Sequence, residues 1–148
     1  AYTMYNIVTA IKAAQMSINT TQTISSAAYK VAANNVDDLF LELDATGTNY
    51  TKQNTMWIVR KPDGKISWLE TGSVESGFKH IVDRHLADFS SFGVQNSTQL
   101  SSFIYTTISQ NSPIQVTTSG QYIYSIAGKT VSIIISDNGY IVTAYPIT

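Results

Sequence analysis

Both histidines of this chain lie in one short stretch, His80-Ile81-Val82-Asp83-Arg84-His85, which also holds one of its two arginines. A histidine changes its charge near neutral pH, so a pair can act as general base and general acid. An arginine beside them can bind a phosphate or stabilise charge in a transition state. Because the chain has so few charged residues, this clustering is its most informative local feature.

RNA cleavage by internal attack needs this set of groups. One group takes the proton of the 2′-hydroxyl, another protonates the departing 5′-oxygen, and a cation stabilises the crowded phosphate. The product is a 2′,3′-cyclic phosphate, and no metal is required. A structural role is the alternative, because a histidine on an apolar helix face is more often a satisfied core residue. Asp83 and Asp88 would then supply capping and ion-pair contacts to the stretch.

A helix is expected to carry the histidines, from Gly77 through Phe78 to about Asp88. On such a helix His80 and Arg84 are four residues apart and share a face. His85 falls within the apolar stripe of the helix. We therefore expect His85 to point toward a sheet, with His80 and Arg84 at the flank. The stripe consists of Phe78, Ile81, Val82 and Phe89.

The C-terminal strand carries a second group of polar residues. Side chains alternate along a strand, so Thr143 and Tyr145 share one face. Lys129 shares a face of the preceding strand with Val131 and Ile133. The alternative is that Thr143 and Tyr145 are ordinary strand formers and that Lys129 is a solvated strand start.

The turn at 137–139 decides which of these faces coincide. A two-residue turn pairs Ile133 with Ala144 or Val142. A three-residue turn with a glycine bulge pairs Ile133 with Thr143 and brings Lys129 to the side of Tyr145. We favour the second form, because residues 136–140 have the same pattern as the turn at 61–65.

The remaining pattern predicts helices first and antiparallel strands last, which is an α+β fold. Residues 39–43 fit either a turn of helix or a strand, and 45–54 is expected to be a loop. Helices are expected near 4–15, 23–33 (ending at Asn34-Asn35) and 97–109. Strands are expected near 56–59, 66–69, 114–118, 121–126, 129–136 and 139–146. The small antiparallel sheet should have the 77–88 helix packed beside it.

The composition limits the classes of function. Charged residues make up 13% and the net charge is −1, which argues against extended nucleic-acid binding but not against a small local site. Without cysteine there are no disulfides and no thiolate metal sites. The uncharged stretch 89–128 is too polar to span a membrane. The chain begins at Ala1 without a signal-peptide pattern, and we interpret it as a piece of a longer protein.

Two motifs together resemble a family of bacterial toxin nucleases. Residues 77–85, Gly-Phe-Lys-His-Ile-Val-Asp-Arg-His, resemble their His-Ile-x-x-Arg-His signature. Residues 137–146 resemble their closing strand, which often ends in a Thr-Ala-Tyr-Pro run. The order and separation of the motifs are similar to those of the barnase/EndoU/colicin/RelE superfamily of RNases, which includes toxins of contact-dependent growth inhibition and other polymorphic toxins.

The resemblance implies a secreted toxin domain that cleaves RNA, often tRNA, in the cytoplasm of a target cell without a metal or other cofactor. It implies a sheet with helices on one side and an RNA cleft on the other, blocked by a cognate immunity protein. Residues 51–148 would be the RNase toxin domain and 1–50 a helical preface. By this resemblance the catalytic residues are His80, His85, Arg84, Lys129, Thr143 and Tyr145, and Lys79 is an alternative to Lys129.

The low proportion of charged residues in this chain is unusual for that family, since phosphate contacts by lysine and arginine are a main source of RNA affinity. Recognition would then rely on shape and stacking, or on an accessory host protein. The low charge and the Ser/Thr-rich neutral stretch also suit a non-catalytic adhesin or phage structural module. That module predicts histidines that are separated, or buried with satisfied partners. ADP-ribosyl transfer ranks last, because neither Glu70 nor Glu75 lies in a convincing motif.

Overall fold

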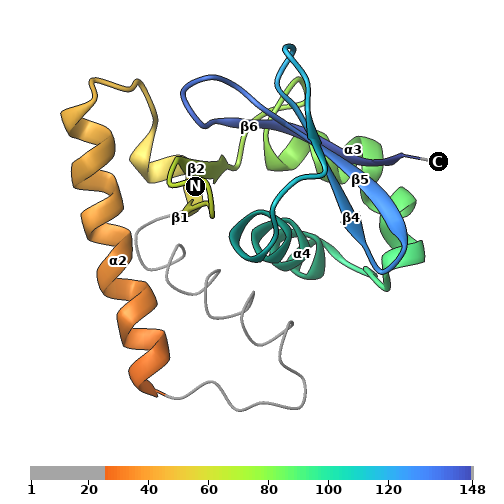
Figure 1. Ribbon diagram of the computed structural model, residues 1–148, viewed down its shortest axis with the longest axis horizontal. Coiled ribbons are helices and arrows are strands. Elements are labelled where there is room, and N and C mark those ends of the chain that lie inside the picture. The colour runs from red at the N-terminus through yellow and green to blue at the C-terminus, as the bar shows by residue number, and fades with distance from the viewer. Residues whose placement is uncertain (1–25, 148) are drawn as a thin grey trace.

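The computed structural model describes residues 26–147, which form the predicted α+β fold (Figure 1). The helices are α2 (Ser26–Ala45), α3 (Phe78–His85) and α4 (Ser97–Gln110), with 3-10 segments η1 (Lys52–Asn54) and η2 (Leu86–Phe92). The strands are β1 (Thr55–Arg60), β2 (Ile66–Glu70), β3 (Gln115–Val116), β4 (Gln121–Ile126), β5 (Lys129–Ile135) and β6 (Ile141–Ile147). Within residues 26–147 no helix has the length and apolarity needed to cross a bilayer.

Helix α2 is longer than the sequence pattern predicts. The expected stop at Asn34-Asn35 is wrong, because the helix continues to Ala45 and includes the segment left open between helix and strand. Tertiary packing overrides the weak helix propensity of asparagine. The residues beyond the expected stop form a buried stripe at helical spacing, Val36, Leu39, Phe40 and Leu43. The helix expected near 4–15 lies outside the described residues.

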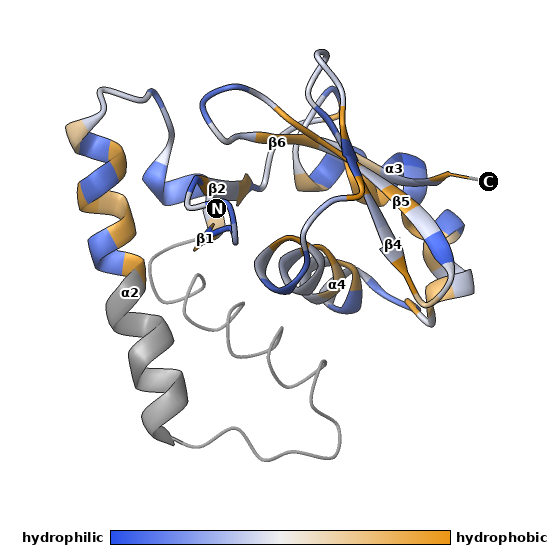
Figure 2. Cartoon of the chain, viewed as in Figure 1, coloured by the Kyte–Doolittle hydropathy of each residue, from blue (hydrophilic) through white to orange (hydrophobic). Residues whose placement is uncertain are grey.

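The stripe of α2 belongs to the same hydrophobic core as the strands. The Phe40 ring stacks on Tyr50 with centroids 5.6 Å apart, and Tyr50 meets the edge of Trp68 at 6.0 Å. Figure 2 shows polar and apolar residues alternating along the described part of α2, as expected for a helix with one buried face. Residues 36–50 therefore pack on the rest of the fold, and residue 50 is not a break in the core.

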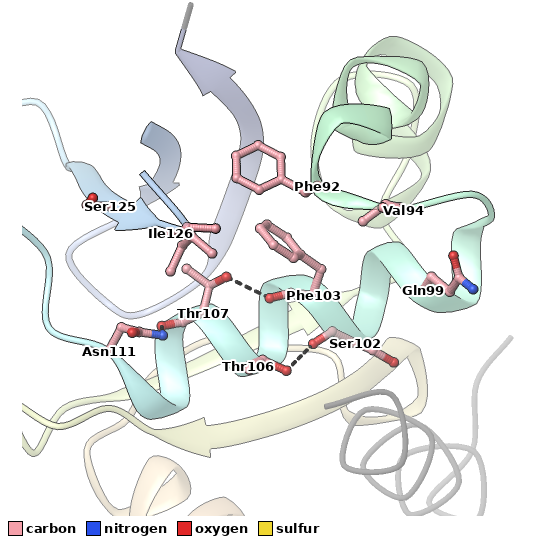
Figure 3. A pocket seen from close by; sticks show the side chains of 12 residues that line it. Phe92, Val94, Gln99, Ser102, Phe103, Thr106, Thr107, Asn111, Ser125 and Ile126 are labelled. Carbon is pink, nitrogen blue, oxygen red and sulfur yellow. Dashed lines mark hydrogen bonds between the residues drawn. The ribbon is translucent and has the colours of Figure 1, made fainter. Parts of the chain in front are cut away.

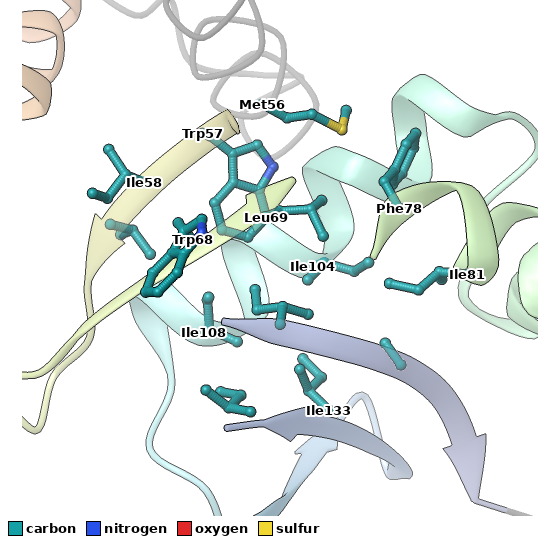
Figure 4. Packing of buried hydrophobic residues seen from close by; sticks show 14 of the residues in the cluster. Met56, Trp57, Ile58, Trp68, Leu69, Phe78, Ile81, Ile104, Ile108 and Ile133 are labelled. Carbon is teal, nitrogen blue, oxygen red and sulfur yellow. The ribbon is translucent and has the colours of Figure 1, made fainter. Parts of the chain in front are cut away.

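Two antiparallel sheets follow α2, a β1-β2 hairpin and a meander in the order β3-β4-β5-β6. Trp68 N and the Ser67 hydroxyl both donate to Gly139 O, at 3.2 and 2.7 Å, and so join the hairpin to the start of β6. Figure 4 shows core side chains from β1, β2, α3, α4 and β5 pointing into one space. The core thus lies between the hairpin, α4 and one face of the meander.

The two turns with the same sequence pattern also have the same hydrogen bonds. Lys61 N donates to Lys65 O at 2.8 Å, and Ser136 N donates to Tyr140 O at 2.9 Å. Within them Gly64 N and Gly139 N donate back to the first residue of each turn, both at 2.9 Å. The predicted three-residue turn with a glycine bulge is confirmed at both places.

The register predicted from that turn is nevertheless wrong. Ile135 pairs with Ile141 as the turn dictates, but the next pair is Ile134 with Thr143, so Val142 forms a second bulge. Ile133 consequently pairs with Ala144 rather than Thr143. One extra residue reverses the faces of a strand. Thr143 and Tyr145 therefore lie on the opposite face of the sheet from Lys129.

Candidate active site

The Val142 bulge is where helix α3 attaches to the sheet. Gly77, immediately before α3, donates its N–H to Val142 O at 2.9 Å. Gly77 has φ 85° and ψ −166°, a conformation open only to glycine. A Cβ there would stand 2.8 Å from the Gly72 Cα and 3.1 Å from Glu70 O. The glycine thus lets the start of α3 approach β6 closely, which brings the histidines to the sheet edge.

The two histidine rings meet each other and the last strand. The centroids of His80 and His85 are 5.7 Å apart, and the centroid of His85 is 5.5 Å from that of Tyr145. His85 ends α3 with φ −130°, outside the helical range, and η2 starts at the next residue. The side chain of His85 is one-quarter exposed. The prediction that His85 points toward the sheet is therefore confirmed.

Both histidines use Nδ1 for a fixed hydrogen bond. The Nδ1 of His80 lies 3.0 Å from Val74 O, and the Nδ1 of His85 lies 3.2 Å from a carboxylate oxygen of Asp88. A carbonyl and a carboxylate only accept, so in the neutral rings Nδ1 carries the proton and Nε2 keeps its lone pair. No hydrogen bond to either Nε2 is found within the described residues. The pair therefore offers two Nε2 atoms for proton transfer.

The sheet face beside His85 carries hydroxyl and amide groups. Thr143 shares this face with Tyr145, whose hydroxyl is 3.4 Å from Gln121 Nε2. Ser132 lies across the strand pair from Tyr145. The hydroxyl oxygens of Ser132 and Thr143 are buried and have no hydrogen-bond partner within residues 26–147. This half-buried face, opposite the core face of Ile133 and Ala144, is the side that would accept a ligand.

The predicted cations do not gather at this face. Lys129 Nζ donates to Ser91 O at 2.6 Å and lies over the Phe92 ring, so its predicted position beside Tyr145 is wrong because of the Val142 bulge. Lys79 pairs with Asp83 at 3.1 Å. Arg84 is exposed, and no hydrogen bond or ion pair joins it to another described residue. It lines a separate hollow with Leu86, Ser90 and Gln95.

A mostly apolar cavity of the fold lies elsewhere. A cavity of about 580 Å³ lies between η2, α4 and the β4-β5 turn. Figure 3 shows Phe92, Phe103 and Ile126 around it, with Thr106 and Thr107 bonded back to their own helix. Its lining has no ionisable side chain. The acid–base groups thus lie on an open sheet surface and do not line this cavity.

Other chemistries find less support among the described residues. In residues 26–147 there is no group of three or more His, Asp or Glu side chains placed to hold a metal ion. Glu70, considered for ADP-ribosyl transfer, accepts hydrogen bonds from Trp68 Nε1 at 2.8 Å and Thr51 N at 3.3 Å. These bonds give Glu70 a structural role at the end of β2.

Comparison with known proteins adds no identity: no family model matches the chain, and a search of curated proteins gives no match. The resemblance to toxin nucleases therefore stays a prediction. Gln121 and Ser132 were not among the residues predicted for the site, and Val74 was not predicted as the partner of His80. Gln121 meets Tyr145 across 24 residues of chain, a contact that only the tertiary fold creates, and Val74 meets His80 through the path of the loop before α3. One contact of the site could be predicted from spacing alone, the pairing of His85 with Asp88, which lies three residues further along the chain.

Proposed function

We propose that this protein is a metal-independent endoribonuclease toxin that cleaves RNA by attack of the 2′-hydroxyl. One observation carries the proposal: the paired rings of His80 and His85, each fixed through Nδ1 and each with Nε2 available, beside Tyr145 on a partly open sheet face. A non-catalytic module has no need for two oriented imidazoles at 5.7 Å. The sheet with its helices on the core face also fits what the resemblance implies.

In the proposed reaction one neutral imidazole takes the proton from the 2′-hydroxyl while the oxygen attacks the phosphorus. The bond from phosphorus to the 5′-oxygen breaks, and the other histidine, protonated, gives its proton to that oxygen. The products are a 2′,3′-cyclic phosphate and a free 5′-hydroxyl. Thr143 and Tyr145 would position the phosphate or a base through their hydroxyl groups, and Gln121 supports the Tyr145 hydroxyl.

We assign the acid to His85 and the base to His80. The carboxylate of Asp88 gives a positively charged His85 a counter-charge at 3.2 Å, whereas His80 faces the neutral carbonyl of Val74. Arg84 is exposed and adjacent to His85 in the chain, so we propose it as the cation that contacts the phosphate. Lys129 would not take part, because its ammonium is held by the Ser91 carbonyl on the other side of the sheet.

The biological setting of the proposal comes from the resemblance alone. The resemblance implies that the substrate is tRNA and that a cognate immunity protein is the partner that blocks the site. The resemblance also implies that this chain is the C-terminal part of a larger secreted toxin that acts in the cytoplasm of a target cell. The small number of cations at the site is the reason to include an accessory host factor in every assay.

Induced expression in bacteria tests the function. We expect growth arrest with discrete RNA loss for the wild type, and neither for His80→Ala or His85→Ala. Asp83→Asn is the matched control, since Asp83 is an exposed residue of the same helix, and within residues 26–147 its side chain pairs only with Lys79. Arrest with intact RNA would indicate another toxin chemistry. Normal growth with soluble wild-type protein, in purified assays with and without cell extract, would favour the binding module.

A sulfur-substituted RNA tests the acid assignment. In a substrate with a bridging 5′-sulfur the leaving thiolate needs no general acid. We expect His85→Ala to regain most of its rate on this substrate and His80→Ala to stay slow. Loss of a general acid or base costs about 10²- to 10⁴-fold on the ordinary substrate. Rescue of His80→Ala instead would reverse the assignment.

A further inference from the structure

A second pocket, unrelated to the histidines, lies at the tip of the β1-β2 hairpin. Its cavity of about 370 Å³ is enclosed by the hairpin turn, the end of α4, and strands β3 and β4. Its lining includes Lys61, Asp63, Lys65, Asn111, Tyr122 and Tyr124. Tyr122 and Tyr124 pair with Ile133 and Val131, so they point to the opposite face of the sheet from Tyr145. The pocket is therefore separate from the proposed nuclease site.

Lys61 is a buried cation with incomplete pairing. Its side chain is only 4% exposed, and its Nζ lies 4.4 Å from the centre of the Tyr122 ring. Its only hydrogen bond in the described part of the chain goes to Asp63 at 3.3 Å, and Asp63 is partly in solvent. The other oxygen of that carboxylate accepts from Lys65 N at 2.8 Å. Burial of an ammonium is costly unless it is well paired, so this lysine has unused capacity to bind an anion.

Tyr124 provides a second unused donor in the same lining. The residue is 1% exposed, and its hydroxyl makes no hydrogen bond with any residue of 26–147. Burial raises the pKa of Tyr124, and Tyr122 and Asp63 add to the effect. The hydroxyl therefore keeps its proton over the physiological range and can donate it. Among the described residues the buried oxygens without a partner are those of Ser132 and Thr143, so the Tyr124 hydroxyl is open to the cavity that the residue lines and can donate to a ligand there.

We propose that this pocket binds the oxyanion of a small ligand, a phosphate or carboxylate group, through the Lys61 ammonium and the Tyr124 hydroxyl. Lys65 adds positive charge to the lining, which then carries two cations against the single carboxylate of Asp63. The ring of Tyr122 holds the ammonium in place from one side. The site is independent of RNA cleavage, so the two proposals succeed or fail separately.

NMR titration of the whole chain with inorganic phosphate, and separately with acetate, tests the site. We expect one of the two anions to give saturable shifts of the Tyr122 and Tyr124 ring signals and of the Lys65 amide. Lys61→Met keeps the alkyl packing and removes the charge, and we expect it to weaken binding about tenfold or more. Lys52→Met is the matched control, because Lys52 also lies over an aromatic ring, that of Phe40 at 4.9 Å.

Saturation by phosphate alone or by acetate alone identifies the anion. The proposal is overturned if neither anion saturates, or if Lys61→Met binds as tightly as the Lys52→Met control. Should Lys61→Met fail to fold, Tyr124→Phe decides, since it removes only the hydroxyl. We expect Tyr124→Phe to bind the anion more weakly than the wild type, and equal affinity would exclude the site.

Discussion

Replacing Gly77 with alanine tests how α3 is held against the sheet. The backbone at φ 85° and ψ −166° costs a non-glycine residue about 1–3 kcal/mol. The new Cβ would also meet the backbone of Gly72 and Glu70 at 2.8 and 3.1 Å. Relief of that overlap pulls the Gly77 N–H from Val142 O, a hydrogen bond that contributes about 1 kcal/mol. We therefore expect Gly77→Ala to lower the free energy of unfolding by about 2–4 kcal/mol.

Urea unfolding followed by tryptophan fluorescence measures this loss, because Trp57 and Trp68 are both 0% exposed. Gly93→Ala is the control: Gly93 has φ 80° and ψ 9°, and nothing lies within 4 Å of an added Cβ. That variant should lose only about 1 kcal/mol, from left-handed backbone strain. We also expect RNA cleavage to fall further in Gly77→Ala, because His85 shifts relative to Tyr145. Equal losses of stability in the two variants would refute the close-approach argument.

Three further changes have defined outcomes. Ser101→Ala leaves the buried Nε1 of Trp57 without its 3.0 Å acceptor, so we expect a loss of about 1–3 kcal/mol in urea unfolding, with exposed Ser97→Ala as the control. Arg60 lowers the pKa of Glu42, so the pair stabilises the fold above the ordinary glutamate pKa and this contribution is lost as pH falls through the lowered one. Glu42→Gln should therefore flatten the acid limb of a thermal-melting profile, and an unchanged limb would contradict the pairing. Burial and Asp44 raise the pKa of Tyr50 to about 12. The resulting stability is fully present below the ordinary tyrosine pKa and should be lost as the pH rises from there to about 12. Tyr50→Phe should remove that alkaline loss, and its persistence would assign it to another group.

Local patterns were sufficient to predict most elements of the fold. The glycines of the turns at 61–65 and 136–140 fix their geometry, and the apolar spacing of residues 100–108 predicts α4. The end of α2 was not predictable from Asn34-Asn35. Helix propensity is a weak term there, and the burial of Phe40 and Leu43 against the hairpin outweighs it.

The site was predictable in part. Clustering of His80 and His85 in the sequence, with the apolar stripe around His85, predicts a pair near the sheet. The bulge at Val142 was not predictable, because it lies where Gly77, more than sixty residues earlier, donates a hydrogen bond to Val142 O. That one bulge separates Lys129 from Tyr145 and brings Tyr145 to His85. Register is a tertiary property wherever a bulge responds to a docked element.

The most direct test of the histidine pair is the end chemistry of cleaved RNA. Purified protein is incubated with total bacterial RNA and a metal chelator, with and without cell extract, and the new 3′ ends are mapped. We expect 2′,3′-cyclic phosphate ends with wild-type protein and with Asp83→Asn. We expect a loss of about 10²-fold or more with His80→Ala and with His85→Ala. Undiminished cleavage by both alanine variants, or complete dependence on a divalent metal, would contradict the account.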